Sequence, residues 1–321
     1  MNGLDIFELS YTIPSLALYL YFTPKLGYRI YKKESAYSHI FYKLIFCKCI
    51  VDLMLQTSSI SFAKSTRWPF MQGFLIQHDY VCRIFYFTSS FCYTVTIGIM
   101  TIMSFNRFVA VRHPLKYKKV FTERKNCLAF VITLIVGLFI GTYSSTLSCT
   151  YIYNVLIGHI YISYTTDTMA YFLSAYTFGL YLPLMIISLI LNILTVIKLK
   201  YMLSKKNSSS KADINLFTYT IMNFLVLSLL FSVYVLKAMS VFADYKQLAI
   251  TGNMFMPFVV DLETFGLFFL SLGTKYVNNI LVIYFISFSP QLLKIFYSKE
   301  HNKINVVTSQ PKLSNVGRSG M

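Results

Sequence analysis

The chain has 321 residues, of which 56% are hydrophobic and only 13% charged, and its formal net charge is +17. A soluble domain needs more charge than this to cover its surface, so we expect lipid to surround most of the chain. The basic excess does not indicate nucleic-acid binding, which requires a soluble basic face; it is better explained by lysines and arginines that flank membrane spans.

Apolar windows long enough to cross a bilayer predict an all-α, seven-helix membrane protein. The windows lie near residues 9–30, 38–62, 80–109, 127–149, 170–197, 214–240 and 268–293. The first is not a cleavable signal peptide, because Asp5 and Glu8 stand where such a peptide carries basic residues. Residues 254–288 are apolar over more than one span, so we predict an apolar outer loop before the seventh helix. Residues 1–297 then form the helical domain, and residues 298–321 a disordered cytosolic tail.

The distribution of basic residues predicts which helix ends face the cytosol. Lysine and arginine gather after the first, third, fifth and seventh windows, for example at Lys32, Lys119, Lys198 and Lys294. Residues 150–169, on the opposite side, contain neither. By the positive-inside rule, the amino terminus lies outside and the carboxyl terminus lies in the cytosol, as expected for a multi-pass protein of the plasma membrane.

The second window contains Lys48 and Asp52, four residues apart and therefore on one face of a helix. Each charge alone is costly inside a membrane, so we predict an intramembrane ion pair. The lysine would compete with a bound cation, which argues against a metal site here. The alternative is that these side chains make ordinary polar contacts between helices.

The third window, residues 80–109, contains Cys82 near its start and Arg107 near its end. The 25 helical steps between them span about 37 Å at about 1.5 Å per residue, more than the ~30 Å hydrocarbon core of a bilayer. The cysteine and the arginine therefore lie at opposite membrane faces. Arg107 must reach water, a carboxylate or a partner protein. For a lone arginine the simplest explanation would be a charge that marks the end of the span.

The residues after Arg107 favour a more specific interpretation. They read Asn106-Arg107-Phe108-Val109-Ala110-Val111-Arg112-His113-Pro114-Leu115-Lys116-Tyr117. This segment resembles the Asp-Arg-Tyr region of rhodopsin-like G-protein-coupled receptors. The opening run from Tyr11 through Pro14 and the ending from Ser289-Pro290 to Lys294 are more similar to nematode serpentine chemoreceptors, within the class V and class G group.

The resemblance implies a receptor that binds a small external ligand and activates the Gα subunit of a heterotrimeric G protein at its cytosolic face. It also implies a location in sensory cilia, and a disulfide between Cys82 and Cys149 that holds a lid over the ligand; two unpaired thiols are the alternative. The residues assigned to G-protein coupling, with the basic residues beside them, are Asn106, Arg107, Phe108, Arg112, Pro114, Lys116, Lys205 and Lys206. The same basic residues would contact anionic membrane lipids.

The sequence departs from the wider rhodopsin-like pattern at two places. Asn106 replaces the usual acid, so Arg107 lacks the adjacent carboxylate that would hold it at rest. Within the sixth window, residues 225–236 include neither the tryptophan nor the proline on which an outward swing of that helix would hinge. The activation relay of the wider family is therefore not expected unchanged in this chain.

Aromatic side chains in the outer halves of the spans suggest a ligand pocket for a small, mostly apolar molecule. The candidate residues are Phe85, Thr88, Phe91, Cys92, Tyr171, Tyr176, Tyr234 and Tyr276. At helical spacing, such stripes are also the ordinary pattern of packing between helices.

Other classes of membrane protein fit less well. A seven-helix transporter or channel subunit is the main alternative, but the chain shows no internal repeat, and the charge distribution opposes a cytosolic amino terminus. An opsin would need a lysine where Ile283 stands. No HExxH, Gly-x-Ser-x-Gly or midplane aspartate pair indicates an enzyme, and we expect no cofactor.

Overall fold

The computed structural model describes residues 3–33, 40–154, 159–165, 167–204, 211–242 and 246–266. All of these lie in one compact unit, Met1–Ser271. The predicted seventh span at 268–293 and the predicted tail at 298–321 lie outside the described residues.

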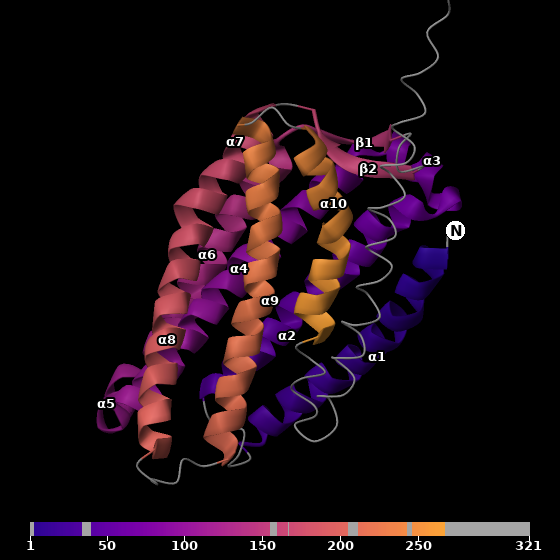
Figure 1. Ribbon diagram of the computed structural model, residues 1–321. Coiled ribbons are helices and arrows are strands. Elements are labelled where there is room, and N and C mark those ends of the chain that lie inside the picture. The colour runs from indigo at the N-terminus through magenta and orange to yellow at the C-terminus, as the bar shows by residue number, and fades with distance from the viewer. Residues whose placement is uncertain are drawn as a thin grey trace, which may run out of the picture. The chain divides into compact units, whose positions relative to one another are not determined.

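Long helices dominate this unit (Figure 1). The helices are α1 (Gly3–Tyr31), α2 (Ile40–Ser58), α3 (Pro69–Gln77), α4 (Asp79–Arg112), α5 (Pro114–Val120), α6 (Glu123–Thr146), α7 (Asp167–Tyr176), α8 (Leu182–Ser204), α9 (Lys211–Phe242) and α10 (Lys246–Asp261). Short π-helical turns extend or join some of them, namely η1 (Ser59–Lys64), η3 (Thr177–Tyr181) and η4 (Leu262–Gly266), and a 3₁₀ turn, η2, covers Ser65–Arg67. Helices thus occupy most of each of the first six predicted windows.

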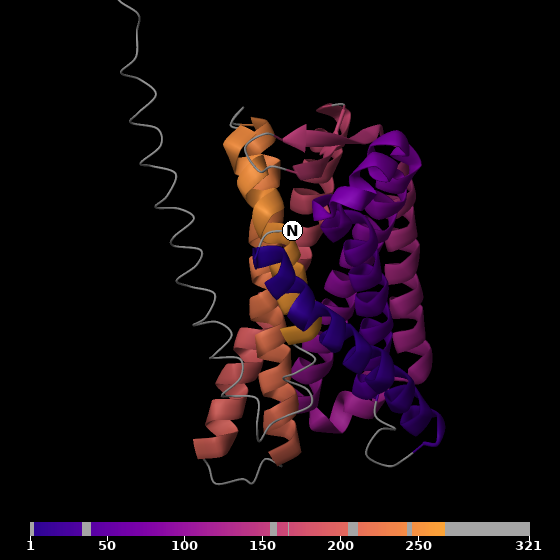
Figure 2. The same cartoon turned by 90° about the vertical axis from the view of Figure 1, so that its right-hand side faces the viewer.

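One antiparallel hairpin interrupts the helical pattern. It pairs β1 (Cys149–Asn154) with β2 (His159–Tyr164), with Cys149 opposite Tyr164 and Asn154 opposite His159. The hairpin packs with α3 and the start of α4 around a small apolar cluster that includes Leu75, Val81 and Ile160. We call this the hairpin end of the bundle; α5 marks the opposite, α5 end (Figures 1 and 2).

Helix α4 is the centre of the bundle and packs against α2, α6, α8 and α9. Its middle, residues 89–100, is buried throughout. Two glycines let α6 approach α4 closely: a Cβ on Gly137 would lie 2.9 Å from Val95, and one on Gly141 would lie 3.0 Å from the Phe87 carbonyl oxygen. Small residues at such a contact let two helix backbones pack closely within a membrane.

Three described helical segments are long and apolar enough to cross a membrane: Asp79–Arg112, Glu123–Thr146 and Tyr171–Leu199. Large apolar side chains remain exposed on them; on α6 these include Ile132, Ile135 and Phe139. Such a surface would be unfavourable in water and suits contact with lipid tails.

The predicted outer loop before residue 268 is wrong for residues 254–266, which form the end of α10 and η4. This segment packs against α9, α1 and α2. Asp261 and Glu263, the two acids of this segment, are buried inside the bundle, where lysines from α2 and η1 pair with them.

Local sequence signals position the α5 end. Pro114 cannot donate the hydrogen bond that would continue α4, and it occupies the first turn of α5. The chain turns there and brings Tyr117 back toward α4. Helix α6 then starts at a conventional cap, because the Thr122 hydroxyl accepts from the Lys125 backbone N–H.

Candidate functional site

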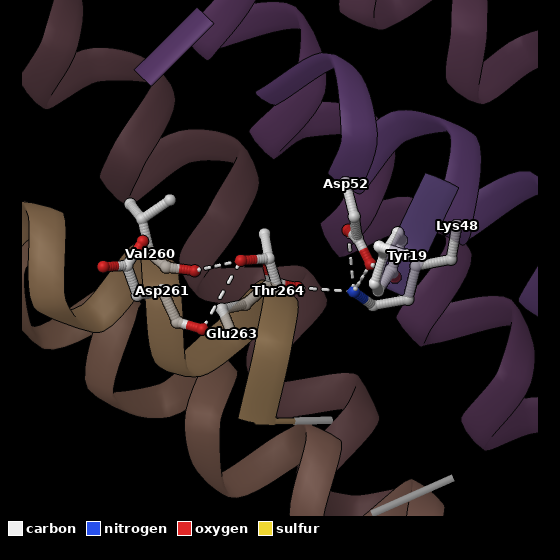
Figure 3. Close-up of polar contacts among 7 residues, drawn as sticks. All are labelled: Tyr19, Lys48, Asp52, Val260, Asp261, Glu263 and Thr264. Carbon is white, nitrogen blue, oxygen red and sulfur yellow. Dashed lines mark hydrogen bonds and ion pairs between the residues drawn. The ribbon is translucent and has the colours of Figure 1, made fainter. Parts of the chain in front are cut away.

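A network of buried charges joins α2 to η4 (Figure 3). The Lys48 ammonium donates to both carboxylate oxygens of Asp52, at 2.8 and 2.7 Å, and to Glu263 Oε1 at 2.6 Å. These three side chains are only 1–2% exposed. The Tyr19 hydroxyl of α1 donates to Asp52 Oδ2 at 2.7 Å. The Lys48–Asp52 contact that the sequence spacing predicted is thus present, and it extends to a third charge from a distant part of the chain.

The same network continues along α2 to a second lysine. Lys64, on η1, donates to the two oxygens of Asp261 at 2.7 and 2.8 Å. Gln56 Nε2 also donates to Asp261, and so does the Tyr11 hydroxyl. The Thr12 hydroxyl oxygen lies 3.3 Å from Lys64 Nζ. Side chains from α1, α2 with η1, and α10 with η4 therefore belong to one polar network.

Two of the π-helical turns supply charged side chains to this network. Lys64 is the last residue of η1, and Glu263 lies within η4. A π turn inserts one residue into a helix and rotates the residues beyond it, and such turns are frequent at functional sites. Asp261 and Glu263, two residues apart, can thereby both face α2 and η1.

Buried tyrosines form a second cluster, between α4, η3 and α9. Tyr234 packs edge-on against Tyr93 and Tyr181, with ring centroids 5.3 and 5.8 Å apart. Tyr176 continues the cluster at 5.1 Å from Tyr181. The Tyr181 hydroxyl lies 2.9 Å from the Thr94 hydroxyl, so its polar end is satisfied. This cluster presents aromatic faces and hydroxyl groups to the interior of the bundle.

The predicted pocket residues separate into three groups. Tyr176 and Tyr234 belong to the tyrosine cluster, and Cys92 is buried in the same core. The side chain of Tyr171 is 59% exposed, and Phe91 packs beside the glycines of α6. Phe85 and Thr88 lie on the hairpin side of α4, with Phe85 against the small apolar cluster and the Thr88 hydroxyl bonded to the Ile84 carbonyl. Tyr276 lies outside the described residues.

Arg107 lies inside the bundle near the α5 end and is only 5% exposed. Its guanidinium carbon stands 3.7 Å from the centre of the Phe41 ring, on α2. A guanidinium over an aromatic face is attracted by the ring quadrupole. The neighbouring Asn106 amide donates to the Tyr117 hydroxyl of α5 at 3.0 Å. Burial raises the pKa of Tyr117, so this hydroxyl stays neutral and can accept the bond.

The remaining coupling candidates lie around this point. Phe108 is half-buried, and Arg112 lies over its ring at 5.7 Å. Arg112, Pro114 and Lys116 are exposed. Lys205 and Lys206 lie outside the described residues.

At the hairpin end, Cys82 of α4 and Cys149 of β1 are both buried and belong to one small apolar cluster. They are two free thiols in this structure. The predicted disulfide therefore stays a prediction, between cysteines that the fold brings together.

Sequence reasoning missed Glu263, Asp261 and Lys64. The available signal was the occurrence of two acids inside a long apolar run, because ionisable residues within membrane segments usually face a partner or a pathway.

The family model for Srg family chemoreceptors matches residues 6–297. The chain belongs to this family of chemoreceptors. The match covers most of the chain and confirms the predicted resemblance to nematode serpentine chemoreceptors. A comparison with curated proteins finds no match. The protein is thus a helical membrane chemoreceptor, of a family that is generally non-enzymatic.

Proposed function

We propose that this Srg chemoreceptor is a G-protein-coupled chemosensory receptor. It would bind a small ligand inside the bundle and activate a heterotrimeric G protein at the α5 end. The observation that carries this proposal is Arg107, a buried arginine within the Asn106–Arg107–Phe108 motif whose guanidinium rests on an aromatic ring of α2.

The contact between Arg107 and Phe41 supports a releasable resting state. Asn106 stands where an acid would hold the arginine by an ion pair, and its amide is directed to Tyr117 instead. A cation–π contact contributes about 0.5–2 kcal/mol, less than a buried ion pair. Movement of α2 or α4 would therefore weaken this contact at modest cost, and the carbonyl oxygens at the end of a Gα helix could then accept hydrogen bonds from the guanidinium.

The surface around Arg107 is suited to an acidic partner. Arg112, Lys116 and Lys119 are exposed at the α5 end. Each basic residue near an anionic membrane contributes about 1 kcal/mol, so these residues would contact lipid as well as Gα.

The tyrosine cluster supports the ligand part of the proposal. These side chains come from four elements and meet in the interior: Tyr93 from α4, Tyr176 from α7, Tyr181 from η3 and Tyr234 from α9. A small, mostly apolar ligand would exchange contacts with these rings and shift an existing equilibrium between bundle arrangements. We further propose that Cys82 and Cys149 form a disulfide that fixes the hairpin over the bundle, with the oxidising lumen of the endoplasmic reticulum accepting the two electrons and two protons that the thiols lose.

The proposed membrane topology has seven spans, an external amino terminus and a cytosolic carboxyl terminus. The proposed location is the plasma membrane, in sensory cilia by family resemblance. An α5 end in the cytosol is the polarity that places Arg107 within reach of Gα.

The test uses intact cells that express the full chain with a tag at each terminus. Antibody access without permeabilisation gives the topology, and nucleotide exchange on a panel of co-expressed Gα proteins gives the coupling. We expect an accessible amino terminus, a protected carboxyl terminus and exchange above that of untransfected cells. A cytosolic amino terminus would contradict the proposal and favour a channel or transporter. Correct topology with no exchange on any Gα, in wild type and in Phe41→Leu alike, would contradict the proposed coupling.

A further inference from the structure

Among the residues that the structure describes, the buried network between α1, α2, α10 and η4 holds more negative than positive groups. Its described members include the carboxylates of Asp52, Asp261 and Glu263 and the ammonium groups of Lys48 and Lys64. Lys64 pairs with Asp261, whereas Lys48 stands between two carboxylates. Two ionised carboxylates on one ammonium leave an uncompensated charge in a site that excludes water, which is costly.

The three carboxylates are not bonded equally. Asp52 accepts from Lys48 at both oxygens and also from Tyr19, and Asp261 accepts from Lys64, Gln56 and Tyr11. Glu263 accepts one hydrogen bond, from Lys48 at Oε1. Its Oε2 atom is buried and has no hydrogen-bond partner among the described residues, and the same is true of Gln56 Oε1. The network thus has an unused acceptor on Glu263, the carboxylate that shares Lys48 with Asp52.

The other ionisable groups that the described elements direct toward this region do not supply that charge. Cys49 faces it from α2, and Cys92 and Tyr93 face it from α4; none of the three carries a positive charge. Lys237, on α9, packs against Gly252, which lies about 16 Å from Glu263 by the rise of α10. Arg107 rests on Phe41, which lies about 10 Å from Lys48 by the rise of α2.

We propose that Asp52 and Glu263 together bind one proton, so that Lys48 lies between a carboxylate and a carboxylic acid. One proton from bulk water adds to a carboxylate oxygen, no other bond changes, and the network becomes neutral. Two carboxylates held close together cannot both ionise easily, and the proton then belongs to the pair.

The proposed proton has a conformational consequence. The Lys48–Glu263 contact connects α2 to η4, and its strength depends on whether Glu263 is ionised. Any rearrangement that separates η4 from α2 would leave the two carboxylates in different surroundings and would change their proton affinity. By linkage, proton binding and that rearrangement influence each other to the same extent. Acidity would therefore shift the conformational equilibrium of the receptor, whatever its ligand or G protein.

Infrared spectroscopy of the purified full-length receptor in lipid nanodiscs tests the proposal without ligand or Gα. Wild-type receptor at neutral pH is expected to show the C=O band of a buried, protonated carboxylic acid, which disappears on titration to alkaline pH. The band should be absent from Glu263→Gln. It should persist in Glu123→Gln, which removes a surface carboxylate that is 79% exposed.

Isotope labelling keeps the test valid if Glu263→Gln does not fold. Wild-type receptor labelled with ¹³C-glutamate or with ¹³C-aspartate should show a downshifted band in at least one of the two samples. Glu263→Asp should retain a titrating acid with a displaced band. Absence of any protonated acid band in folded wild-type receptor would overturn the proposal. So would a band that survives in folded Glu263→Gln, or stabilisation of the wild-type receptor by sodium with no titrating acid, which would assign the site to a metal cation.

Discussion

Buried cations are stabilised in two different ways in this receptor. In the network between α1, α2, α10 and η4, carboxylates pair with Lys48 and Lys64, and tyrosine hydroxyls donate hydrogen bonds to those carboxylates. Near the α5 end, Arg107 rests on the ring of Phe41. Loss of one partner in a buried ion pair is severe, whereas a cation–π contact is weaker and depends on the orientation of one ring. The comparison suggests that the first region fixes helix positions and that the second can release its cation during signalling.

The largest effect is expected at Lys48. Lys48→Met leaves Asp52 and Glu263 buried beside a neutral side chain, and the expected loss is about 3–5 kcal/mol of stability. Thermal unfolding of detergent-solubilised receptor measures this loss. Lys43→Met is the matched control on the same helix, because its ion pair with Glu123 is exposed to solvent and should contribute little to stability. Equal effects of the two substitutions would show that the network does not stabilise the bundle.

A smaller effect is expected at Tyr19. Tyr19→Phe removes one hydrogen bond to the Asp52 carboxylate while the ring remains, and the expected cost is about 1.5–3 kcal/mol. The same unfolding measurement applies, with Tyr31→Phe as the control, because Tyr31 is on α1 and 84% exposed. If Tyr19→Phe were as harmless as Tyr31→Phe, the contact from α1 would be dispensable.

At Phe41 we expect a gain of basal activity rather than a loss of stability. Phe41→Leu removes the ring under Arg107, and the released guanidinium should raise basal nucleotide exchange on Gα by about 2- to 30-fold, which corresponds to 0.5–2 kcal/mol. Phe46→Leu makes the same change on α2 at a ring that packs beside Gly27, and it should leave exchange unchanged. Unchanged exchange in Phe41→Leu at equal surface expression would show that the ring does not restrain Arg107.

The smallest effect is expected at Tyr117. Tyr117→Phe removes the acceptor of the Asn106 amide, a neutral hydrogen bond that contributes about 0.5–1.5 kcal/mol. The anchoring of α5 to α4 should loosen, and hydrogen exchange of the α5 backbone amides should become faster. Exchange in α3, at the hairpin end, serves as the internal reference. Equal protection of α5 in variant and wild type would contradict a role for this bond.

Local spacing made part of the charge network predictable. Lys48 and Asp52 are four residues apart, so the helix itself brings them together. Glu263 is 215 residues from Lys48 along the chain, and only the packing of α10 and η4 against α2 places it there. The sequence did not reveal that helix, because residues 254–288 form an apolar run longer than one span, and an outer loop was predicted at its start.

The aromatic residues were harder to place for a different reason. In a membrane the lipid-facing side of a helix is as apolar as the interior, so hydrophobic periodicity does not reveal which face is buried. Periodicity accordingly does not distinguish Tyr176, which is buried, from Tyr171, which is exposed on the same helix, α7. Phe91 faces α6 because Gly137 and Gly141 leave room there, which the sequence of α4 alone cannot show.

The most direct test of the account is Gα nucleotide exchange in membranes that contain Arg107→Ala, compared at equal surface density with wild type and with Arg124→Ala. Arg124 is an exposed arginine at the start of α6 and controls for the loss of one positive charge. We predict that exchange in Arg107→Ala, and in Phe41→Leu combined with Arg107→Ala, falls to the level of membranes without receptor, while Arg124→Ala behaves like wild type. Exchange that persists in Arg107→Ala would contradict the claim that this arginine couples the receptor to its G protein.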